Sequence, residues 1–134
     1  MTGPVPVRRL LLILAVEDLG RARRFWDAAF GWEVAAEVPV YVEYRVGPSL
    51  GLGLYARGGF ARNTGVPPAA VPPGGIAATE VYLLVDDLPA AVRRLEAAGA
   101  RLLSPAARRE WGDEAAYFAD PDGNVVAVAV EGPG

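Results

Sequence analysis

Residues 115–130 read AAYFADPDGNVVAVAV, and this stretch decides the fold. Two apolar runs with strand character flank the turn Asp-Pro-Asp-Gly at 120–123. Proline presets φ at the second turn position, and aspartate and glycine suit the positions around it. The stretch therefore predicts a tight β-hairpin. Before it, the pattern predicts a strand at 80–85, a helix at 88–98 and a short strand at 101–104.

The first half of the chain repeats this order. Val-Glu-Asp-Leu at 16–19 matches Val-Asp-Asp-Leu at 85–88, and the same offset aligns Arg24 with Arg93 and Asp27 with Glu96. Each half is predicted to form a βαβββ unit. Because a duplicated unit of this kind cannot readily cover its sheet alone, two units should pack together.

The repeat predicts three segments within a single structural domain. They are a first module at 1–56, a connector at 57–78 and a second module at 79–134. The connector is rich in Gly, Pro and Ala and is too long for a simple turn, so a mobile flap is one interpretation. Asp18 is a suitable helix N-cap in the first module, and Asp87 in the second. The elements expected there are a strand at 10–16, a helix at 19–30 and strands at 32–37, 40–46 and 50–56.

Composition excludes several classes of function. The chain has 134 residues, 52% of them hydrophobic, a net charge of −3 and a pI near 4.9. A mildly acidic chain suits nucleic acid poorly, because phosphate binding requires clustered basic residues. Cysteine and histidine are both absent, which removes disulfides, thiolate nucleophiles, Cys/His zinc sites and Ser-His-Asp triads. A metal would need carboxylates, amides and water alone.

The N-terminal region superficially resembles a signal peptide. Arg8 and Arg9 precede the apolar run 10–16, but Glu17 and Asp18 follow at once and no small-residue cleavage site is present. We interpret the run as a strand covered on both faces. No run is long enough to span a membrane, so we expect a cytoplasmic protein without membrane partners.

Several motifs together identify a family resemblance. They are a strand ending in Val-x-Asp-Leu, a helix with Arg-x-Phe-Trp at 23–26 and Phe-Gly-Trp at 30–32, the repeat, and Tyr-Phe-x-Asp-Pro-Asp-Gly-Asn at 117–124. The chain resembles the vicinal oxygen chelate superfamily, which includes glyoxalase I, extradiol dioxygenases, and fosfomycin- and bleomycin-resistance proteins. The resemblance implies an α+β fold in which two βαβββ modules form a curved mixed sheet around a cup. The fold alone does not define an activity.

The resemblance also implies four metal-ligand positions, on the first and last strand of each module. In this sequence they are occupied by Leu11, Gly53, Glu80 and Ala127. Only Glu80 can coordinate a metal, whereas catalytic divalent sites generally need about three protein ligands. We therefore predict no metal and no other cofactor, and we expect the metal-dependent activities of the family to be absent.

Alternation along the strands predicts which side chains face the cup. The glycines of the last strand in the first module have two interpretations, packing between modules or room for a ligand. Trp111, beside Gly112, either stacks on a planar ligand, as the resemblance suggests, or covers the edge of the core. Trp26 and Trp32 are expected in packing roles. The predicted ligand-binding set is Tyr41, Glu43, Arg45, Gly53, Tyr55, Glu80, Tyr82, Trp111 and Ala127.

Glu80 has three interpretations. It is a satisfied carboxylate paired with Arg45 or Arg9, an anchor for a cation, or a general base with a raised pKa. The sequence does not rank the last two.

The leading functional hypothesis is a metal-free small-molecule binding protein. It would resemble the bleomycin-resistance branch and sequester a cationic or aromatic antibiotic between aromatic walls and carboxylates. Binding members of the family are often two-fold dimers, so we expect a homodimer. One alternative is a metal-independent isomerase, epimerase or lyase that uses Glu80 as base, with only Tyr82 and Arg45 available as partners. The other is a non-catalytic assembly domain whose cup is filled by side chains.

Overall fold

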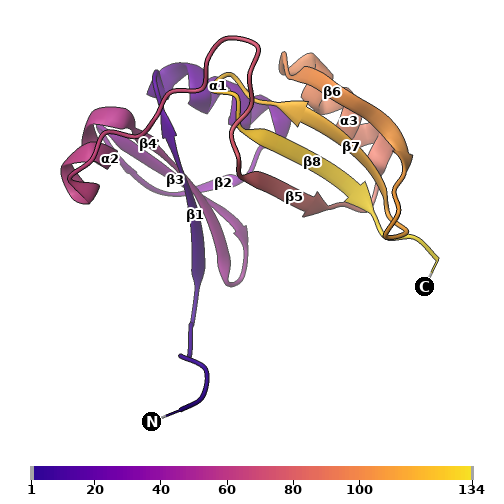
Figure 1. Cartoon of the computed structure of the whole chain (residues 1–134), viewed down its shortest axis with the longest axis horizontal. Helices are drawn as coiled ribbons and strands as arrows, with labels where there is room; N and C mark the ends of the chain where they lie inside the picture. The colour runs from indigo at the N-terminus through magenta and orange to yellow at the C-terminus, as the bar shows by residue number, and fades with distance from the viewer. Residues whose placement is uncertain (1, 134) are drawn as a thin grey trace. The chain divides into compact units, whose positions relative to one another are not determined.

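The structure, a computed structural model, describes residues 2–133 and contains two four-stranded sheets (Figure 1). Their strand orders are β1-β4-β3-β2 and β5-β8-β7-β6. In each sheet the first strand runs parallel to the last, and the other pairs are antiparallel. The predicted α+β fold with two βαβββ modules is therefore confirmed. The elements are β1 Leu10–Val16, α1 Leu19–Ala29, β2 Glu33–Val38, β3 Tyr41–Gly47, β4 Leu50–Ala56, α2 Arg57–Thr64, β5 Glu80–Leu84, α3 Leu88–Ala97, β6 Arg101–Arg108, β7 Glu114–Ala119 and β8 Val125–Val130.

The chain divides into two compact units, and the division does not follow the repeat. Of the described residues, the first unit holds 2–19 and 32–68, and the second holds 20–31 and 69–133. Helix α1, which the repeat assigns to the first module, thus groups with the second sheet. Among residues 2–133, no helix has the length and apolar character needed to cross a bilayer.

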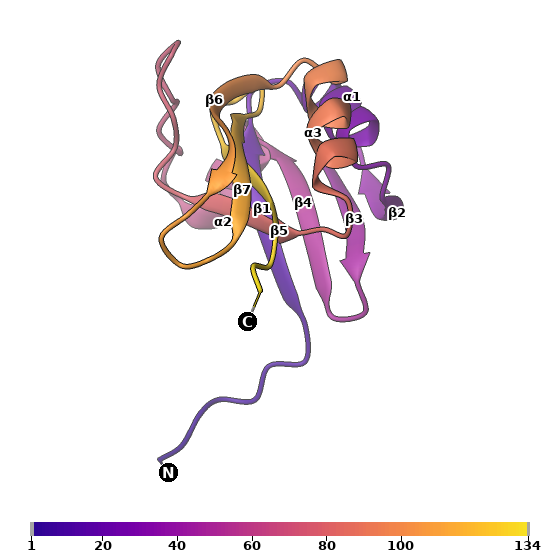
Figure 2. The same cartoon turned by 90° about the vertical axis from the view of Figure 1, so that its right-hand side faces the viewer.

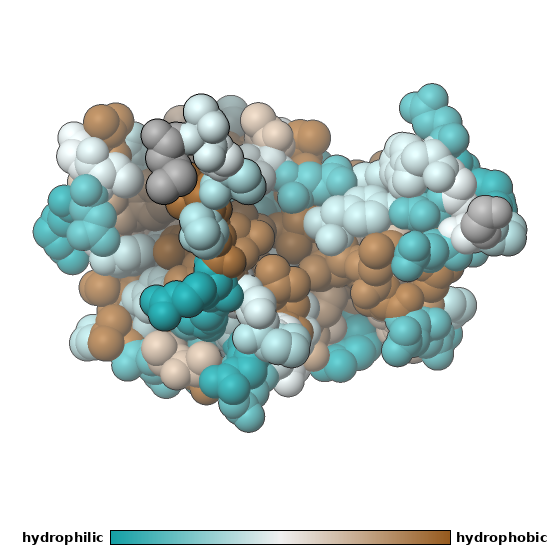
Figure 3. Space-filling model, turned by 90° about the horizontal axis from the view of Figure 1, so that it is seen from below, coloured by the Kyte–Doolittle hydropathy of each residue, from teal (hydrophilic) through white to brown (hydrophobic). Residues whose placement is uncertain are grey.

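The first unit is built on the strand alternation expected from its sequence. Leu52 and Leu54 on β4 lie opposite Tyr44 and Val42 on β3, and all four side chains are buried. Strand β1 was expected to be covered on both faces, and that expectation is wrong. Leu14 and Val16, near the end of β1, are buried, whereas Leu10 at its start is 60% exposed. Large apolar side chains therefore remain at the surface. Figure 3, which draws one face of the molecule, shows exposed apolar residues on that face.

Helix α2 lies inside the segment that the sequence suggested was a connector. It begins directly after β4 and ends at Gly65, whose φ of 78° is the left-handed conformation that glycine adopts readily. Phe60 of this helix contacts the ring of Tyr55 edge-on, with 6.3 Å between the centroids. The rest of the connector is also held: in the second unit, Ala77 N donates to Gly123 O over 2.8 Å.

The second unit packs its helices and the hairpin around a buried centre. Helix α3 contacts β7 and β8, and its N-cap Asp87 accepts a hydrogen bond from Ala90 N at 3.0 Å, as predicted for this aspartate. Figure 2 shows α1 beside α3, and Arg94 Nη2 of α3 donates to Ala28 O of α1 at 3.1 Å. Trp26 of α1 is fully buried, which confirms its predicted packing role.

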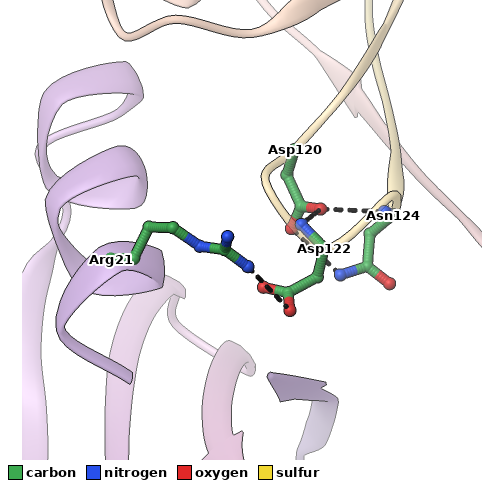
Figure 4. A network of polar contacts seen from close by, with 4 residues as sticks. All are labelled: Arg21, Asp120, Asp122 and Asn124. Atoms are coloured by element: carbon green, nitrogen blue, oxygen red, sulfur yellow. Dashed lines mark hydrogen bonds and ion pairs between the residues drawn. The ribbon is translucent and has the colours of Figure 1, made fainter. Parts of the chain in front are cut away.

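The predicted hairpin turn joins β7 to β8. Asp120 N donates to Asn124 O at 2.9 Å, and Gly123 N donates to Asp120 O at 3.0 Å. Gly123 has a φ of 84°, which explains glycine at this turn position. Figure 4 shows that the Asp122 carboxylate of this turn also faces Arg21 of α1, with 3.5 Å between Asp122 Oδ1 and Arg21 Nη2. This contact joins the hairpin turn to helix α1 through two residues that are 101 positions apart in the chain.

Candidate functional site

The four positions implied as metal ligands occupy equivalent places in the two sheets. Leu11 lies opposite Gly51, two residues before Gly53, and Glu80 lies opposite Val125, two residues before Ala127. Of these side chains only Glu80 carries an oxygen donor. Within residues 2–133 no three His, Cys, Asp or Glu side chains group closely enough to hold a metal ion. This donor set does not fit a divalent cation.

On the first sheet, a buried carboxylate lies between an arginine and a tyrosine. Glu43 of β3 is only 8% exposed. Tyr41 Oη donates to Glu43 Oε1 at 2.8 Å, and Arg9 Nη2 donates to Glu43 Oε2 at 2.9 Å. Each carboxylate oxygen therefore has a donor, and the charge of Glu43 is balanced by Arg9. The sequence suggested Arg9 only as a partner of Glu80, so its pairing with Glu43 was not predicted.

Two glycines of β4 make room for these side chains. A Cβ at Gly53 would lie 2.5 Å from Tyr41 Oη. One at Gly51 would lie 2.5 Å from Leu11 Cδ2 and 3.1 Å from Arg9 Nη2. Side chains of the first unit thus fill the space above both glycines, Tyr41 above Gly53 and Leu11 with Arg9 above Gly51. We call Gly51 and Gly53, together with Arg9, Tyr41 and the Glu43 carboxylate that both of these side chains contact, the glycine trough.

These contacts move the pKa values of both acids in the trough. Burial alone would raise the pKa of Glu43 and is the largest single influence. Hydrogen bonds from Tyr41 and Arg9, together with the Arg9 charge, outweigh burial and lower that pKa. The pKa of Tyr41 is raised, because burial and the hydrogen bond to the Glu43 carboxylate both favour the neutral phenol.

The Glu43 shift predicts a pH dependence of stability. Because its pKa is lower in the folded than in the unfolded chain, ionised Glu43 stabilises the fold above its ordinary pKa. That contribution is lost as the pH falls through the folded-state pKa. We expect acidification from about pH 6 to about pH 3 to lower the free energy of unfolding more in wild type than in Glu43→Gln. Urea unfolding of both proteins at the two pH values checks this, and an equal loss in both would contradict it.

On the second sheet, two aromatic side chains share one carboxylate. Tyr82 Oη donates to Asp113 Oδ2 at 2.7 Å, and Trp111 Nε1 is 3.1 Å from both Tyr82 Oη and Asp113 Oδ2. The two rings meet at 61° with centroids 6.3 Å apart. Trp111 is nevertheless 54% exposed. We call these three residues the Tyr82–Trp111–Asp113 cluster. Sequence reasoning found both aromatic residues but missed Asp113, which lies two positions after Trp111.

The face of the second sheet that carries Tyr82 extends across three strands. Tyr82 lies opposite Ala127, and Ala127 lies opposite Tyr117, so two tyrosines flank a small, fully buried side chain. The Arg109 guanidinium lies 4.9 Å from the Tyr117 ring centroid and donates to Ala115 O at 2.8 Å. Burial raises the pKa of Tyr82, and the hydrogen bond to Asp113 raises it further. Burial also raises the pKa of Tyr117, and the negative charge of Glu80 adds to that increase.

The predicted site residues therefore fall into two groups. Arg45 lies at an exposed end of its strand, 3.9 Å from Glu33. Glu80 is exposed on the Tyr82 face, and no hydrogen bond or ion pair of its carboxylate occurs within residues 69–133. The structure brings together Tyr41, Glu43, Gly53 and Tyr55 in the first unit, and Tyr82, Trp111 and Ala127 in the second.

Comparison with known proteins agrees with this architecture. A family model described as the Glyoxalase/Bleomycin resistance protein/Dioxygenase superfamily matches residues 9–128. A glyoxalase-related enzyme from Fulvimarina pelagi is similar in structure, with 24% identity, a TM-score of 0.80 and coverage of 93% of this chain and 89% of that one. A glyoxalase/bleomycin resistance protein/dioxygenase from Nocardioides has 26% identity, a TM-score of 0.80 and coverage of 99% and 88%. No curated protein matches the chain.

Proposed function

Because the chain belongs to the glyoxalase/bleomycin resistance protein/dioxygenase superfamily, we propose that it binds a cationic, partly aromatic small molecule without a metal. Sequestration of an antibiotic of this chemistry is the biological role that we propose. The supporting observation is the Tyr82–Trp111–Asp113 cluster. An aromatic pair and an adjacent carboxylate are complementary to a planar cation.

The exposed indole of Trp111 is held in place by its hydrogen bonds. Trp111 Nε1 has two acceptors at 3.1 Å, while about half of the side chain remains exposed. Anchoring a large aromatic side chain at the surface reduces the rotamer entropy that a ligand would otherwise have to remove. A planar ring that stacks on Trp111 would therefore meet a preorganised partner.

The charges of the second unit favour a cation. Asp113 accepts hydrogen bonds from two neutral donors, and within residues 69–133 no arginine forms an ion pair with it or with Glu80. Glu43, which sequence reasoning also placed in the ligand-binding set, is already paired with Arg9. We therefore assign the anchoring charge to Asp113 and Glu80.

We expect loss of the indole to weaken binding. Isothermal titration with a bleomycin-class glycopeptide should give an affinity about tenfold lower for Trp111→Ala than for wild type. Asp113→Asn removes the charge and keeps an acceptor, so it should also weaken binding. Glu33→Gln, a change at an exposed carboxylate of the first unit, is the matched control and should bind like wild type.

Two results would contradict the proposal. One is that bleomycin-class glycopeptides and other planar cations leave the melting temperature unmoved at saturating concentration. The other is that Trp111→Ala binds as tightly as wild type. We also propose a homodimer located in the cytoplasm, and sedimentation velocity measures the first of these properties.

The enzyme hypothesis has less support. Glu80 is exposed, whereas a general base usually owes a raised pKa to burial. The phenol of Tyr82, the acid that the sequence suggested, donates a hydrogen bond to Asp113. Arg45 is engaged with Glu33 in the first unit. We therefore rank binding above isomerase, epimerase or lyase activity.

A further inference from the structure

The glycine trough places a side-chain cation of the protein on a buried carboxylate. Glu43 is almost fully buried, and a buried carboxylate needs a compensating charge. Within residues 2–68, Arg9 is the cation within ion-pair distance of it. The sheet therefore offers a carboxylate that accommodates a guanidinium group at one oxygen while Tyr41 donates to the other.

Arg9 does not use the full hydrogen-bonding capacity of its guanidinium group at Glu43. It makes one hydrogen bond to Glu43, from Nη2 to Oε2, although a guanidinium can bind a carboxylate through two parallel bonds. The Arg9 side chain is 42% exposed, and it precedes β1 rather than lying within the strand. Only this exposed side chain would have to rotate into solvent for Glu43 to accept another cation.

Space for the remainder of a ligand lies beside Arg9. A surface depression of about 260 Å³ is lined by residues 7–10 together with Ser49 and Leu50. Arg9 borders both this depression and the trough. A ligand with a guanidinium group at one end could therefore replace Arg9 at Glu43 and rest its other end in the depression.

We propose that the glycine trough is a binding site for an organic cation of the guanidinium class, which Arg9 occupies in the free protein. The site belongs to the first unit and involves none of the residues of the Tyr82–Trp111–Asp113 cluster. A tethered side chain competes at an effective concentration in the millimolar range, so Arg9 weakens binding of any free cation. The chemistry that fits is a flat cation with several N–H donors.

Removal of Arg9 should open the site to methylguanidinium. In ¹H–¹⁵N spectra, the amides of Gly51 and Gly53 report on the trough. We expect methylguanidinium to shift both signals saturably in Arg9→Ala, at a concentration about tenfold lower than in wild type. It should also raise the melting temperature of Arg9→Ala more than that of wild type.

Matched variants separate this site from general effects of the probe. Arg62→Ala removes an exposed arginine of α2 in the same unit and should respond like wild type. Arg9→Ala combined with Glu43→Gln should not respond. If Arg9→Ala does not fold, Arg9→Gln, whose neutral amide can still donate to Glu43, carries the same expectation.

The proposal is overturned if Gly51 and Gly53 do not shift in the Arg9 variants at millimolar probe. It is also overturned if the double variant responds equally. Gly112, beside Trp111, reports on the second unit in the same spectra. A failure of the trough can therefore be distinguished from a failure of the proposed function.

Discussion

Asp120→Ala lowers the free energy of unfolding by about 3 kcal/mol, because one buried carboxylate holds the β7–β8 turn together. Asp120 is 5% exposed. Its Oδ1 accepts from Asp122 N at 2.9 Å and Asn124 N at 2.8 Å, and its Oδ2 accepts from Asn124 Nδ2 at 2.9 Å (Figure 4). Alanine would leave both backbone donors without this acceptor. Urea unfolding measures the loss.

Two further variants separate the charge of Asp120 from its hydrogen bonds. Burial, the largest influence, raises the pKa of Asp120 despite its hydrogen bonds, so its negative charge is itself costly. Asp120→Asn removes that charge and keeps one oxygen acceptor, and we expect it to be less destabilising than alanine. Asp86→Ala, at an exposed aspartate, should change stability by less than about 0.5 kcal/mol. If Asp120→Ala matched Asp86→Ala, the turn would not depend on this carboxylate.

The features that sequence predicted correctly are those set by local chemistry. The Asp-Pro-Asp-Gly turn, the Asp87 cap and the repeated order of elements each depend on residues close together in the chain. Strand alternation likewise predicted that Tyr41, Glu43 and Arg45 share one face of their strand, because its period follows from backbone geometry. In the structure Glu43 lies opposite Gly53 and Arg45 opposite Gly51. Such signals need no knowledge of distant contacts.

Long-range pairing accounts for what sequence did not predict. Arg9 and Glu43 are 34 positions apart, and no local pattern links them. The partnership of Tyr82 with Asp113 spans 31 positions. Grouping of α1 with the second sheet depends on contacts such as that of Arg94 with Ala28 O, which the repeat alone does not contain. Helix α2 escaped prediction because its glycines have low helix propensity.

The same limit applied to the choice among carboxylates. Sequence reasoning singled out Glu80 as a cation anchor or general base and gave Glu43 only a place in the ligand-binding set. Their environments differ: Glu43 is buried and paired with Arg9, whereas Glu80 is exposed. The difference depends on whether an arginine from a distant part of the chain reaches the carboxylate, and neither acid carries a local sequence signal for that.

A substitution at Gly53 tests whether the β4 glycines are needed for packing or leave room for a ligand, through its effect on the free energy of unfolding. A Cβ there would lie 2.6 Å from Tyr41 Cε1 and 2.8 Å from Tyr41 Cζ, so the ring must move. Movement of the ring would strain the strand or break the Tyr41–Glu43 hydrogen bond. We expect Gly53→Ala to lower the free energy of unfolding by about 2 kcal/mol.

The effect should reverse when the ring is absent. In a Tyr41→Ala background the added methyl group has space, and alanine in a strand is more stable than glycine by about 0.5–1 kcal/mol. Urea unfolding of the four proteins in this cycle should therefore give a coupling energy of about 3 kcal/mol between positions 41 and 53. Gly58→Ala, where a Cβ would lie 3.8 Å from the flexible Arg62 side chain, should be independent of Tyr41. Equal destabilisation by Gly53→Ala in both backgrounds would mean that the Tyr41 ring is not the reason for glycine, because the cost would then arise from the backbone.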